Sequence, residues 1–493
     1  MRKFISLGLF IILLFSLPRV SAAYNYSPLM DVIASAEALI VNQVVDSSNL
    51  VDSNNDSIEY KFGTLVDVAT FNDDIYIVDS SNNKIVVLDE NFHFKATFPD
   101  PSEATLNAPR GIFITKNYIY VADTNNLRVA IFDHDYNYVR EITQPDDPTF
   151  KSSPEDVDGY DFKPLKIAVD RNERVYVVAD QIFEGIIDFN PDGTFSRYVG
   201  ANTVTISAWE AFWLLFTSEE QRKAQGYRFA TTFVNLNVDE EGHLYTVSSS
   251  REGNQVIKKL NYKGKDVLIR NGYFPQIGDV YTIGGRVKVP TGSSEFVDID
   301  VNDYGTYSVL DRTRGRIFTY DFEGNLLYIG GQLGNIGGVT DNQSSLFLQP
   351  EALTYYKDKL LVVDSLNKNL VVMEYTEFAK LVNEATYHYY HGDYDKAKEI
   401  WEEVLVHNTN YYLAYAGIGK SQIRHGNYKE AMENLKIGYD DYNYSKAYKQ
   451  YRYDRLMKVF PYVIGLSLVV LVYLFVKSIR NSLKLEREDE KNE

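Results

Sequence analysis

The stretch Ile75-Tyr-Ile-Val-Asp79, followed by Asn82-Asn-Lys-Ile-Val-Val-Leu88, decides the fold. It reads as an apolar strand that ends at an aspartate, then a polar turn, then a second apolar strand. A run of four to six apolar residues bounded by Asn, Asp or Gly is typical of a short strand. The pattern returns along the chain, and its six copies begin near Leu65, Pro109, Pro164, Phe233, Phe296 and Pro350.

Each copy predicts a small antiparallel sheet. One such sheet cannot bury both of its faces, whereas six sheets packed radially around an axis can. The sequence therefore predicts an all-β six-bladed propeller over residues 23–376, with a helical insertion at 205–227. A propeller has to close its ring, and we expect Ala23–Ser27 to supply the outer strand of the last blade.

Beyond the last copy, the apolar period changes from two residues to 3.6, which is typical of helices. Gly392 and Ala397 recur 34 residues later as Gly426 and Ala431. This is the period of TPR repeats, so we predict an α-helical TPR pair with a linking helix over residues 377–457. Two repeats provide only a short groove. A peptide-docking site and a spacer between the propeller and the membrane therefore both stay open.

Both ends of the chain carry apolar segments. Met1-Arg2-Lys3 precedes an apolar run and the small residues Val20-Ser21-Ala22, which is the layout of a secretory signal peptide over residues 1–22. Val459–Val476 is an 18-residue uncharged run, long enough for a bilayer core. We predict a transmembrane helix at 458–477 and a cytoplasmic tail at 478–493. The chain would then cross the cell membrane once, with its N-terminal bulk outside the cytoplasm.

Composition excludes several classes of function. The chain of 493 residues contains no cysteine, which excludes disulfides, thiol catalysis and cysteine-ligated metals. Its formal net charge is −18. Nucleic-acid binding needs a basic face for the phosphates, so we expect no nucleic-acid partner.

The strand copies resemble NHL repeats over about Tyr24–Thr376, through the pattern P-x-x-[IL]…[IL]-Y-V-x-D-[ST]-x-N-[NK]. The whole order of features resembles the propeller-plus-TPR surface proteins of Gram-positive bacteria whose genes tend to lie beside sugar-type ABC transporters. Three stretches carry this closer likeness: Ser218–Arg222, Val256–Asn261, and Ser308–Arg312 together with Gly315–Tyr320. The resemblance implies the architecture and an association with carbohydrate transport, and it implies no particular chemistry.

The innermost strand of each predicted blade lines the central channel. Aligning the copies places charged or amide side chains in one column or just before it, among otherwise apolar residues. We expect these side chains to converge on one mouth of the channel, where a convergent polar cluster is the usual ligand site. The predicted ligand-binding residues are Asp67, Arg110, Lys166, Asn235, Asp298 and Glu351. The alternative is a mutually satisfied ion network that plugs the axis.

The predicted fold is also similar to that of six-bladed lactonases of the gluconolactonase type. That resemblance implies one divalent cation on the axis, held by a Glu, Asn and Asp set that is matched here by Asp67, Asn235, Asp298 and Glu351. Oxygen ligands suit Ca²⁺ or Mg²⁺. However, Lys166 and Arg110 in the same ring would repel a cation, and no catalytic histidine is apparent. We therefore expect no cofactor, with Ca²⁺ or Mg²⁺ as the alternative.

The predicted insertion at 205–227 is unusually aromatic. Its aromatic residues follow a helical spacing of i, i+3, i+4 and i+7: Trp209, Phe212, Trp213 and Phe216. Exposed aromatic clusters mark interfaces, so one interpretation is a partner-binding patch. The other is a helical hairpin packed over a face of the propeller.

These features favour a membrane-anchored extracytoplasmic binding protein. Its expected partners are a protein of the cell envelope and a glycan or small-molecule ligand, in a role accessory to a carbohydrate ABC transport system. The sequence shows no recognisable catalytic constellation, which favours a protein that is not an enzyme. A metal-dependent lactonase-like hydrolase that uses the axial pocket, and a purely structural surface scaffold, are the alternatives.

Overall fold

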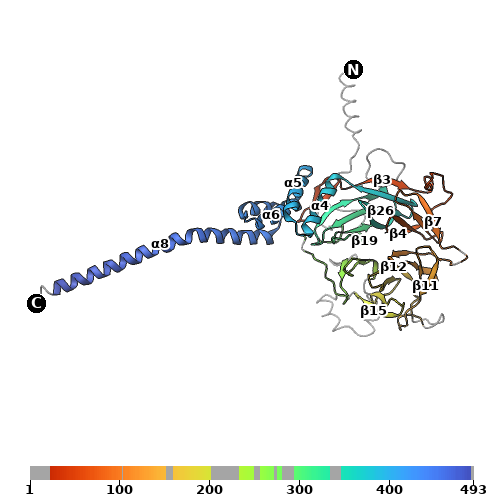
Figure 1. Ribbon diagram of the computed structural model, residues 1–493, viewed down its shortest axis with the longest axis horizontal. Helices are drawn as coiled ribbons and strands as arrows, with labels where there is room; N and C mark the ends of the chain where they lie inside the picture. The colour runs from red at the N-terminus through yellow and green to blue at the C-terminus, as the bar shows by residue number, and fades with distance from the viewer. Residues whose placement is uncertain are drawn as a thin grey trace, which may run out of the picture. The chain divides into compact units, whose positions relative to one another are not determined.

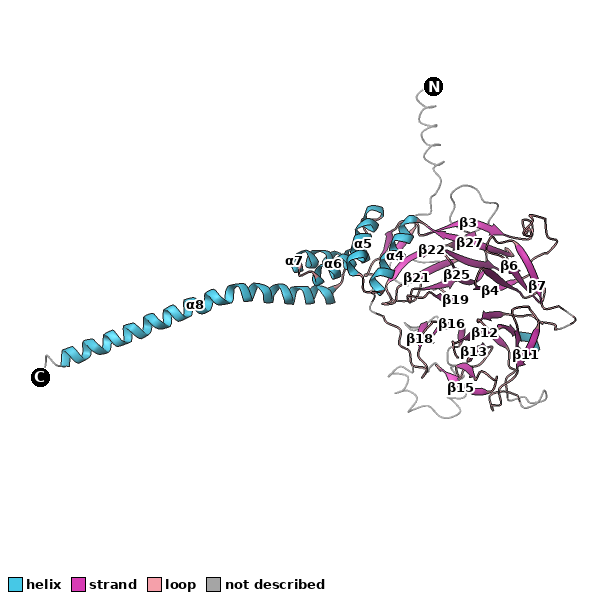
Figure 2. Ribbon diagram, viewed as in Figure 1, coloured by secondary structure: helices cyan, strands magenta, loops and turns pink. Residues whose placement is uncertain are grey.

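The computed structural model describes residues 23–489, except 101, 103, 152–158, 201–231, 249–255, 271, 273–274, 280–293 and 334–345. The chain divides into two compact units, Met1–Thr386 and Tyr387–Glu493. The described part of the first unit is built almost entirely from strands, and that of the second from helices (Figure 2).

The first unit is a six-bladed β-propeller, as predicted (Figure 1). Each blade is an antiparallel sheet whose strands pair in chain order from the axis outward, except that the last blade takes its outer strand, β3, from near the start of the chain. The first three blades consist of β4 (Leu65–Phe71), β5 (Asp74–Asp79), β6 (Lys84–Leu88) and β7 (Phe94–Phe98); β8 (Gly111–Ile114), β9 (Ile119–Asp123), β10 (Arg128–Phe132) and β11 (Tyr138–Ile142); and β12 (Pro164–Val169), β13 (Val175–Ala179), β14 (Ile186–Phe189) and β15 (Phe195–Val199).

The fourth blade has three described strands, and the last two blades have four. They consist of β16 (Phe233–Val238), β17 (Leu244–Ser248) and β18 (Ile257–Leu260); β19 (Phe296–Val301), β20 (Tyr307–Asp311), β21 (Arg316–Tyr320) and β22 (Leu326–Gly330); and β25 (Pro350–Tyr356), β26 (Lys359–Asp364), β27 (Asn369–Tyr375) and β3 (Leu39–Val45). The shorter elements are β1 (Tyr24–Tyr26), β2 (Val32–Ala34), β23 (Gln332–Leu333), β24 (Leu346–Phe347) and the 3₁₀ turn η1 (Thr124–Asn126).

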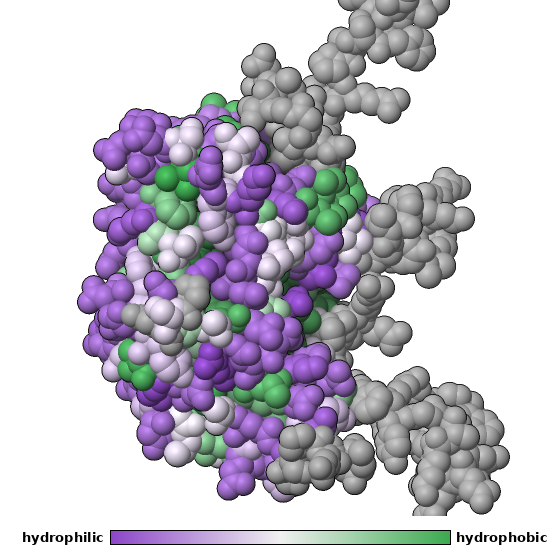
Figure 3. Space-filling view, turned by 90° about the vertical axis from the view of Figure 1, so that its right-hand side faces the viewer, coloured by the Kyte–Doolittle hydropathy of each residue, from purple (hydrophilic) through white to green (hydrophobic). Residues whose placement is uncertain are grey.

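The core lies between neighbouring blades. Second strands such as β9 are buried along their whole length, because both faces of an inner strand contact an adjacent sheet. One cluster, which includes Leu65, Ile77 and Val363, joins the last blade to the first. Hydrophobic residues are gathered inside accordingly, and the face drawn in Figure 3 is mostly hydrophilic with small separate hydrophobic patches.

The aspartate that ends the second strand explains the repeated motif. The Asp79 carboxylate accepts hydrogen bonds from the backbone N–H of Gly63 and from the Asn82 amide, both at 2.8 Å. Asp364 accepts from the backbone N–H of Leu348 at 2.6 Å in the same way. Each buried aspartate thus joins the turn that follows it to the loop that leads into its blade.

The prediction for the ring-closing strand was wrong. The outer strand of the last blade is β3, which pairs with β27 from Leu39↔Tyr375 to Val45↔Leu370. Ala23–Ser27 instead contains β1, which pairs with β2. The reason is length and pattern: β3 has seven residues to match the seven of β27, whereas β1 has three and soon meets a turn.

The helical region begins with α4 (Glu377–Tyr390), α5 (Tyr394–His407), α6 (Tyr412–Arg424) and α7 (Tyr428–Ile437). Gly392 and Gly426 occupy equivalent turns before α5 and α7, both with positive φ, which explains glycine at these positions. Within the second unit, a Cβ on Gly419 would meet Leu435 at 2.6 Å, so glycine allows α6 and α7 to approach closely.

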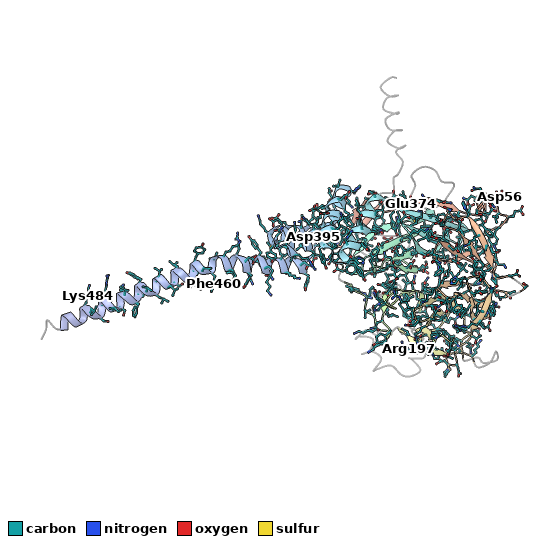
Figure 4. The ribbon with its side chains drawn as sticks, viewed as in Figure 1. Asp56, Arg197, Glu374, Asp395, Phe460 and Lys484 are labelled. Carbon is teal, nitrogen blue, oxygen red and sulfur yellow. The ribbon has the colours of Figure 1, made fainter. Side chains whose placement is uncertain are left out.

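The last helix, α8 (Asp441–Asp489), contains one candidate membrane span by length and composition. Its most apolar window has a mean hydropathy of 2.5, and none of that window is buried. Figure 4 shows Phe460 and Lys484 on this helix. The helix continues through the predicted ends of the span at 458 and 477. Those two bounds, and the other predicted domain limits, stay predictions.

Candidate functional site

The described part of the propeller contains a polar pocket on its axis. The pocket has a volume of about 560 Å³ and is lined mainly by the innermost strands of the six blades. Most lining positions lie in the second half of these strands or in the turns that follow them, such as Asn302, Tyr304 and Lys357. The pocket therefore runs along the axis toward the turns that connect the first and second strands of the blades.

Four of the predicted site residues come together at the inner end of this pocket. Asp67 on β4, Lys166 on β12, Asn235 on β16 and Asp298 on β19 all line it, and we call them the floor ring. Lys166 Nζ lies 2.5 Å from Asp67 Oδ1. The amide of Asn235 donates to Asp298 Oδ1.

The other two predicted residues do not join the floor ring. Arg110 is exposed, and it is not among the lining residues of the pocket. Glu351 also lies outside the lining, and its Oε2 accepts a hydrogen bond from Arg312 at 2.9 Å. Arg110 directly precedes Gly111 and Glu351 directly precedes Ala352, the two positions aligned with the floor ring, and neither side chain lines the pocket.

The floor ring also joins neighbouring blades through backbone amides. Asp67 Oδ2 accepts the N–H of Ile112 on the second blade at 2.8 Å. Asp298 Oδ2 accepts the N–H of Leu353 on the last blade at 2.6 Å. The register of the innermost strand shifts just before the ring residue, as between Leu65 and Asp67. A bulge changes the direction of the side chain that follows it, which allows the ring residue to reach the backbone of a neighbouring blade.

A second layer repeats this arrangement two residues further along the strands. It consists of Asn237, Asp300 and Thr354. Asn237 Nδ2 donates to Asp300 Oδ1 at 2.5 Å, while Asp300 Oδ2 accepts from Thr354 Oγ1 at 3.0 Å and from the N–H of Tyr355 at 2.7 Å. None of these three residues was among the predicted site residues. The repeated Asn-x-Asn and Asp-x-Asp spacing, at 235–237 and 298–300, was the available signal.

The pocket wall is divided by polarity. The last three blades contribute the second layer and the tyrosines Tyr304, Tyr328, Tyr355 and Tyr375. The positions equivalent to the second layer in the first two blades are Ala69 and Phe113, which also line the pocket. A ligand in this space would meet hydrogen-bonding groups on one side and apolar groups on the other.

Burial raises the pKa values of two acids in the pocket. It raises the pKa of Asp298 to about 8, against the lowering effect of the Lys166 charge. Burial also raises the pKa of Asp300 to about 6, although the hydrogen bonds that this carboxylate accepts oppose the change. Desolvation penalises the charged form of a carboxyl group, which accounts for both directions.

The floor ring does not fit the divalent cation that a lactonase would need. Asp67 is paired with Lys166, and Asn235 Oδ1 already accepts the N–H of Leu236 at 2.6 Å. The other side of the Asn235 amide is a donor and faces Asp298. A Ca²⁺ or Mg²⁺ site requires several oxygens free to converge on one point, and this ring directs an ammonium group and an amide N–H₂ toward its carboxylates.

A second group of potential ligands lies at a surface turn. One ligand atom from each of Asp239, Glu241 and His243 lies within 4.8 Å of the others. However, Asp239 Oδ2 is 2.9 Å from Lys259 Nζ, and Asp239 Oδ1 accepts the N–H of His243 at 2.8 Å. These contacts explain the group as a turn that Asp239 caps and that an Asp239–Lys259 ion pair stabilises.

The aromatic residues predicted to bind a partner, Trp209, Phe212, Trp213 and Phe216, lie outside the described residues. The structure therefore does not test the insertion at 205–227 as an interface.

No protein-family model and no curated protein matches the chain. Solved structures match at low identity. Virginiamycin B lyase from Staphylococcus aureus is 12% identical with a TM-score of 0.38, covering 68% of this chain and 98% of that chain. An auxiliary nutrient binding protein from Bacteroides thetaiotaomicron is 12% identical with a TM-score of 0.42, covering 70% and 78%. A protein described provisionally as a gluconolactonase is 10% identical with a TM-score of 0.41, covering 72% and 98%.

These likenesses say nothing about activity. The architecture rests on the chain's own strand pairing: a six-bladed β-propeller followed by a helical region with one long apolar helix.

Proposed function

We propose that this protein is a non-catalytic, membrane-anchored binding protein whose axial pocket holds a small polar ligand. One observation carries the proposal. The pocket combines about 560 Å³ of space with the polar floor ring and a wall that is polar on one side and apolar on the other. Pockets of this size with a few convergent polar groups are typical of small-molecule sites.

The hydrogen bonds and ion pairs of two pocket acids support a binding function and not a hydrolase. Asp300 accepts four hydrogen bonds, from Asn237, Thr354 and the N–H groups of Val301 and Tyr355. Asp67 is occupied by Lys166 and by the N–H of Ile112. A general base needs a lone pair within reach of substrate. Asp67 and Asp300 therefore have little capacity left to act as the bases that the hydrolase alternative would use.

The helical region supports an anchored protein with a partner. Equivalent glycines 34 residues apart turn the chain into α5 and α7, in agreement with a TPR pair, and α8 carries the candidate span. On this proposal the signal peptide exports the propeller, and residues 478–493 form a cytoplasmic tail. A protein of the cell envelope, as part of a carbohydrate ABC transport system, is the proposed partner.

The ligand proposal is tested by native mass spectrometry on the full-length protein purified in detergent from its membrane. We expect a co-purifying small molecule that is lost in Ala69→Leu, which places extra volume in the pocket. Ala96→Leu, on outer strand β7, is the matched control and should retain the ligand. Equal ligand occupancy in both variants would contradict the axial site, and an empty wild-type protein would favour the scaffold alternative.

The partner proposal is tested by cross-linking in intact cells followed by mass spectrometry. We expect transporter subunits to cross-link to the wild type and to be lost in Trp209→Ala/Trp213→Ala, with the melting temperature of the propeller unchanged. Loss of folding in this variant would show that the insertion packs on the propeller. Cross-links confined to unrelated proteins would contradict the transport role.

A further inference from the structure

The charges that line the axial pocket do not balance. Four acids line it, Asp67, Asp298, Asp300 and Asp303, against two bases, Lys166 and Lys357. Lys166 is paired with Asp67. Lys357 Nζ lies 2.9 Å from both Asp73 and Glu90, neither of which lines the pocket.

Three carboxyl groups are therefore left without a direct ion pair, although the Lys166 charge still acts on Asp298. Among the residues that the structure describes, no ion pair involves Asp298, Asp300 or Asp303. Asp298 and Asp300 are 5% and 8% exposed, so water compensates their charge poorly. Buried carboxylates are normally matched by a positive group, and the adjoining space is large enough for one to come from a ligand.

Asp298 also retains hydrogen-bonding capacity at the end of the pocket. Its Oδ1 accepts from the N–H of Ile299 at 2.9 Å and from the Asn235 amide. Among described residues its Oδ2 accepts only the N–H of Leu353. A carboxylate oxygen can accept two hydrogen bonds, so one acceptor position on Asp298 Oδ2 stays available.

A buried hydroxyl gives an independent indication of a ligand. Thr306 lines the pocket and is 1% exposed, yet within the described part of the chain its Oγ1 has no hydrogen-bond partner. Such orphaned groups are rare because each one costs free energy. The wall beside it carries the rings of Tyr304 and Tyr328, and aromatic faces attract cations.

From these observations we infer that the axial pocket binds a small organic ammonium ion, with its charged end at Asp298 and its apolar body along Ala69 and Phe113. This inference rests on the proposed binding function and specifies the ligand class for the same site. An ammonium group would supply the missing positive charge. Neutral polyols are the competing class, because the second layer could hydrogen-bond to hydroxyl groups.

The test uses isothermal titration calorimetry on the full-length protein in detergent. The probes are two pairs matched in shape: choline with 3,3-dimethylbutan-1-ol, and butylammonium with butan-1-ol. Glucose is the polyol probe. We expect each ammonium ion to bind at least about tenfold more tightly than its alcohol at about pH 9.

The preference should weaken at about pH 5, where Asp298 is protonated while choline keeps its charge. The groups that face Asp298 are Asp67 from β4, Lys166 from β12 and Asp300 from its own strand, while β16 and β25 present Asn235 and the backbone of Leu353. The change in selectivity would report these carboxyl groups.

Two variants locate the bound ion. Asp298→Asn should abolish the preference for ammonium ions. Thr306→Val should weaken ammonium binding without harming the fold, which keeps the test valid if Asp298→Asn is unstable. Thr124→Val alters another buried threonine that does not line the pocket, so it should leave the preference unchanged.

The possible outcomes distinguish the ammonium inference from the binding function on which it rests. Equal binding of ammonium ions and alcohols, or tight binding of glucose alone, would overturn the ammonium inference and leave the binding function standing. A co-purified ligand without positive charge would overturn it as well. No binding of any probe, together with no co-purified ligand, would overturn both.

Discussion

At the scale of single residues, the buried aspartates of the described blades have defined structural partners. Asp79 and Asp364 hold turns, while Asp67, Asp298 and Asp300 join blades through the N–H groups of the next innermost strand. Among the described buried side chains with an atom that lacks a hydrogen-bond partner, Thr306 is the one that lines the pocket. Such exceptions in a well-paired core point to function more specifically than the presence of polar residues does.

Thr306→Val should leave the free energy of unfolding unchanged or raise it by about 1–3 kcal/mol, because it removes a buried hydroxyl without a partner. Thr246→Val is the matched control. Its Oγ1 donates to the backbone oxygen of Asn235 at 2.7 Å, so this variant should lose about 1–2 kcal/mol. Chemical denaturation of the two variants measures the contrast. A larger loss for Thr306→Val than for Thr246→Val would contradict the role given to Thr306.

The raised pKa values of Asp298 and Asp300 predict a pH dependence of stability. Between the pKa of an unfolded aspartate near 4 and the folded values of about 8 and about 6, the native state holds more protons than the unfolded state. These two groups therefore stabilise the fold at low pH and lose that contribution as pH rises toward 8. The slope is at most about 1.4 kcal/mol per pH unit for each group.

Melting curves of the wild type and Asp298→Asn between about pH 4 and about pH 8 isolate this effect, since the variant lacks one titrating group. We expect the decline in Tm with rising pH to be shallower in Asp298→Asn. Parallel curves would show that Asp298 titrates as it does in the unfolded chain.

At the scale of elements, the ring is closed by a strand from one end of the first unit pairing with a strand from the other. Leu39 and Val45 of β3 are 1% and 2% exposed, while Ile40 between them is 40% exposed. In Figure 1, β3 lies beside the strands of the last blade. Leu39 belongs to the core cluster between the last two blades and Val45 to the cluster between the last blade and the first, so β3 packs against both neighbouring blades while Ile40 meets solvent.

Leu39→Asp should destabilise the propeller by about 3–5 kcal/mol, because it places a carboxylate in the core between the last two blades. Ile40→Asp puts the same group on the exposed face of the same strand and should change stability by no more than about 0.5 kcal/mol. Urea denaturation compares them. Similar losses in both variants would mean that β3 does not close the ring as described.

At the scale of the whole molecule, the chain combines a propeller with an anchor-like helix. Side chains along the apolar part of α8 are exposed, including Leu466 at 68% and Phe475 at 66%. Exposed apolar surface of this extent needs another apolar phase to cover it. A bilayer is the phase that an uncharged stretch of this length suits.

Sidedness can be measured directly because the chain has no native cysteine. Ser445→Cys lies before the span and Ser482→Cys after it, and both positions are exposed. With a membrane-impermeant maleimide on intact cells, we expect Ser445→Cys to be labelled at once and Ser482→Cys only after permeabilisation. The reverse pattern would place the propeller in the cytoplasm and overturn the predicted export.

The amino-acid sequence by itself determined the number of blades, the helical region and the apolar helix. These depend on local periodicity, such as the apolar run that ends at Asp79 and the recurrence of Gly392 as Gly426. It also placed Asp67, Lys166, Asn235 and Asp298 in one column, since equivalent positions of repeated strands face one axis.

Only the tertiary structure decided which strand closes the ring, which column neighbours leave the axis, and which polar groups are already paired. These outcomes depend on contacts between residues far apart in the chain, such as β3 with β27 and Asp298 with Leu353. Arg110 and Glu351 lie outside the lining of the pocket, and an ion pair with Lys166 occupies Asp67. What a pocket can bind depends on the hydrogen-bonding positions and charges left over, and those exist only once the chain has folded.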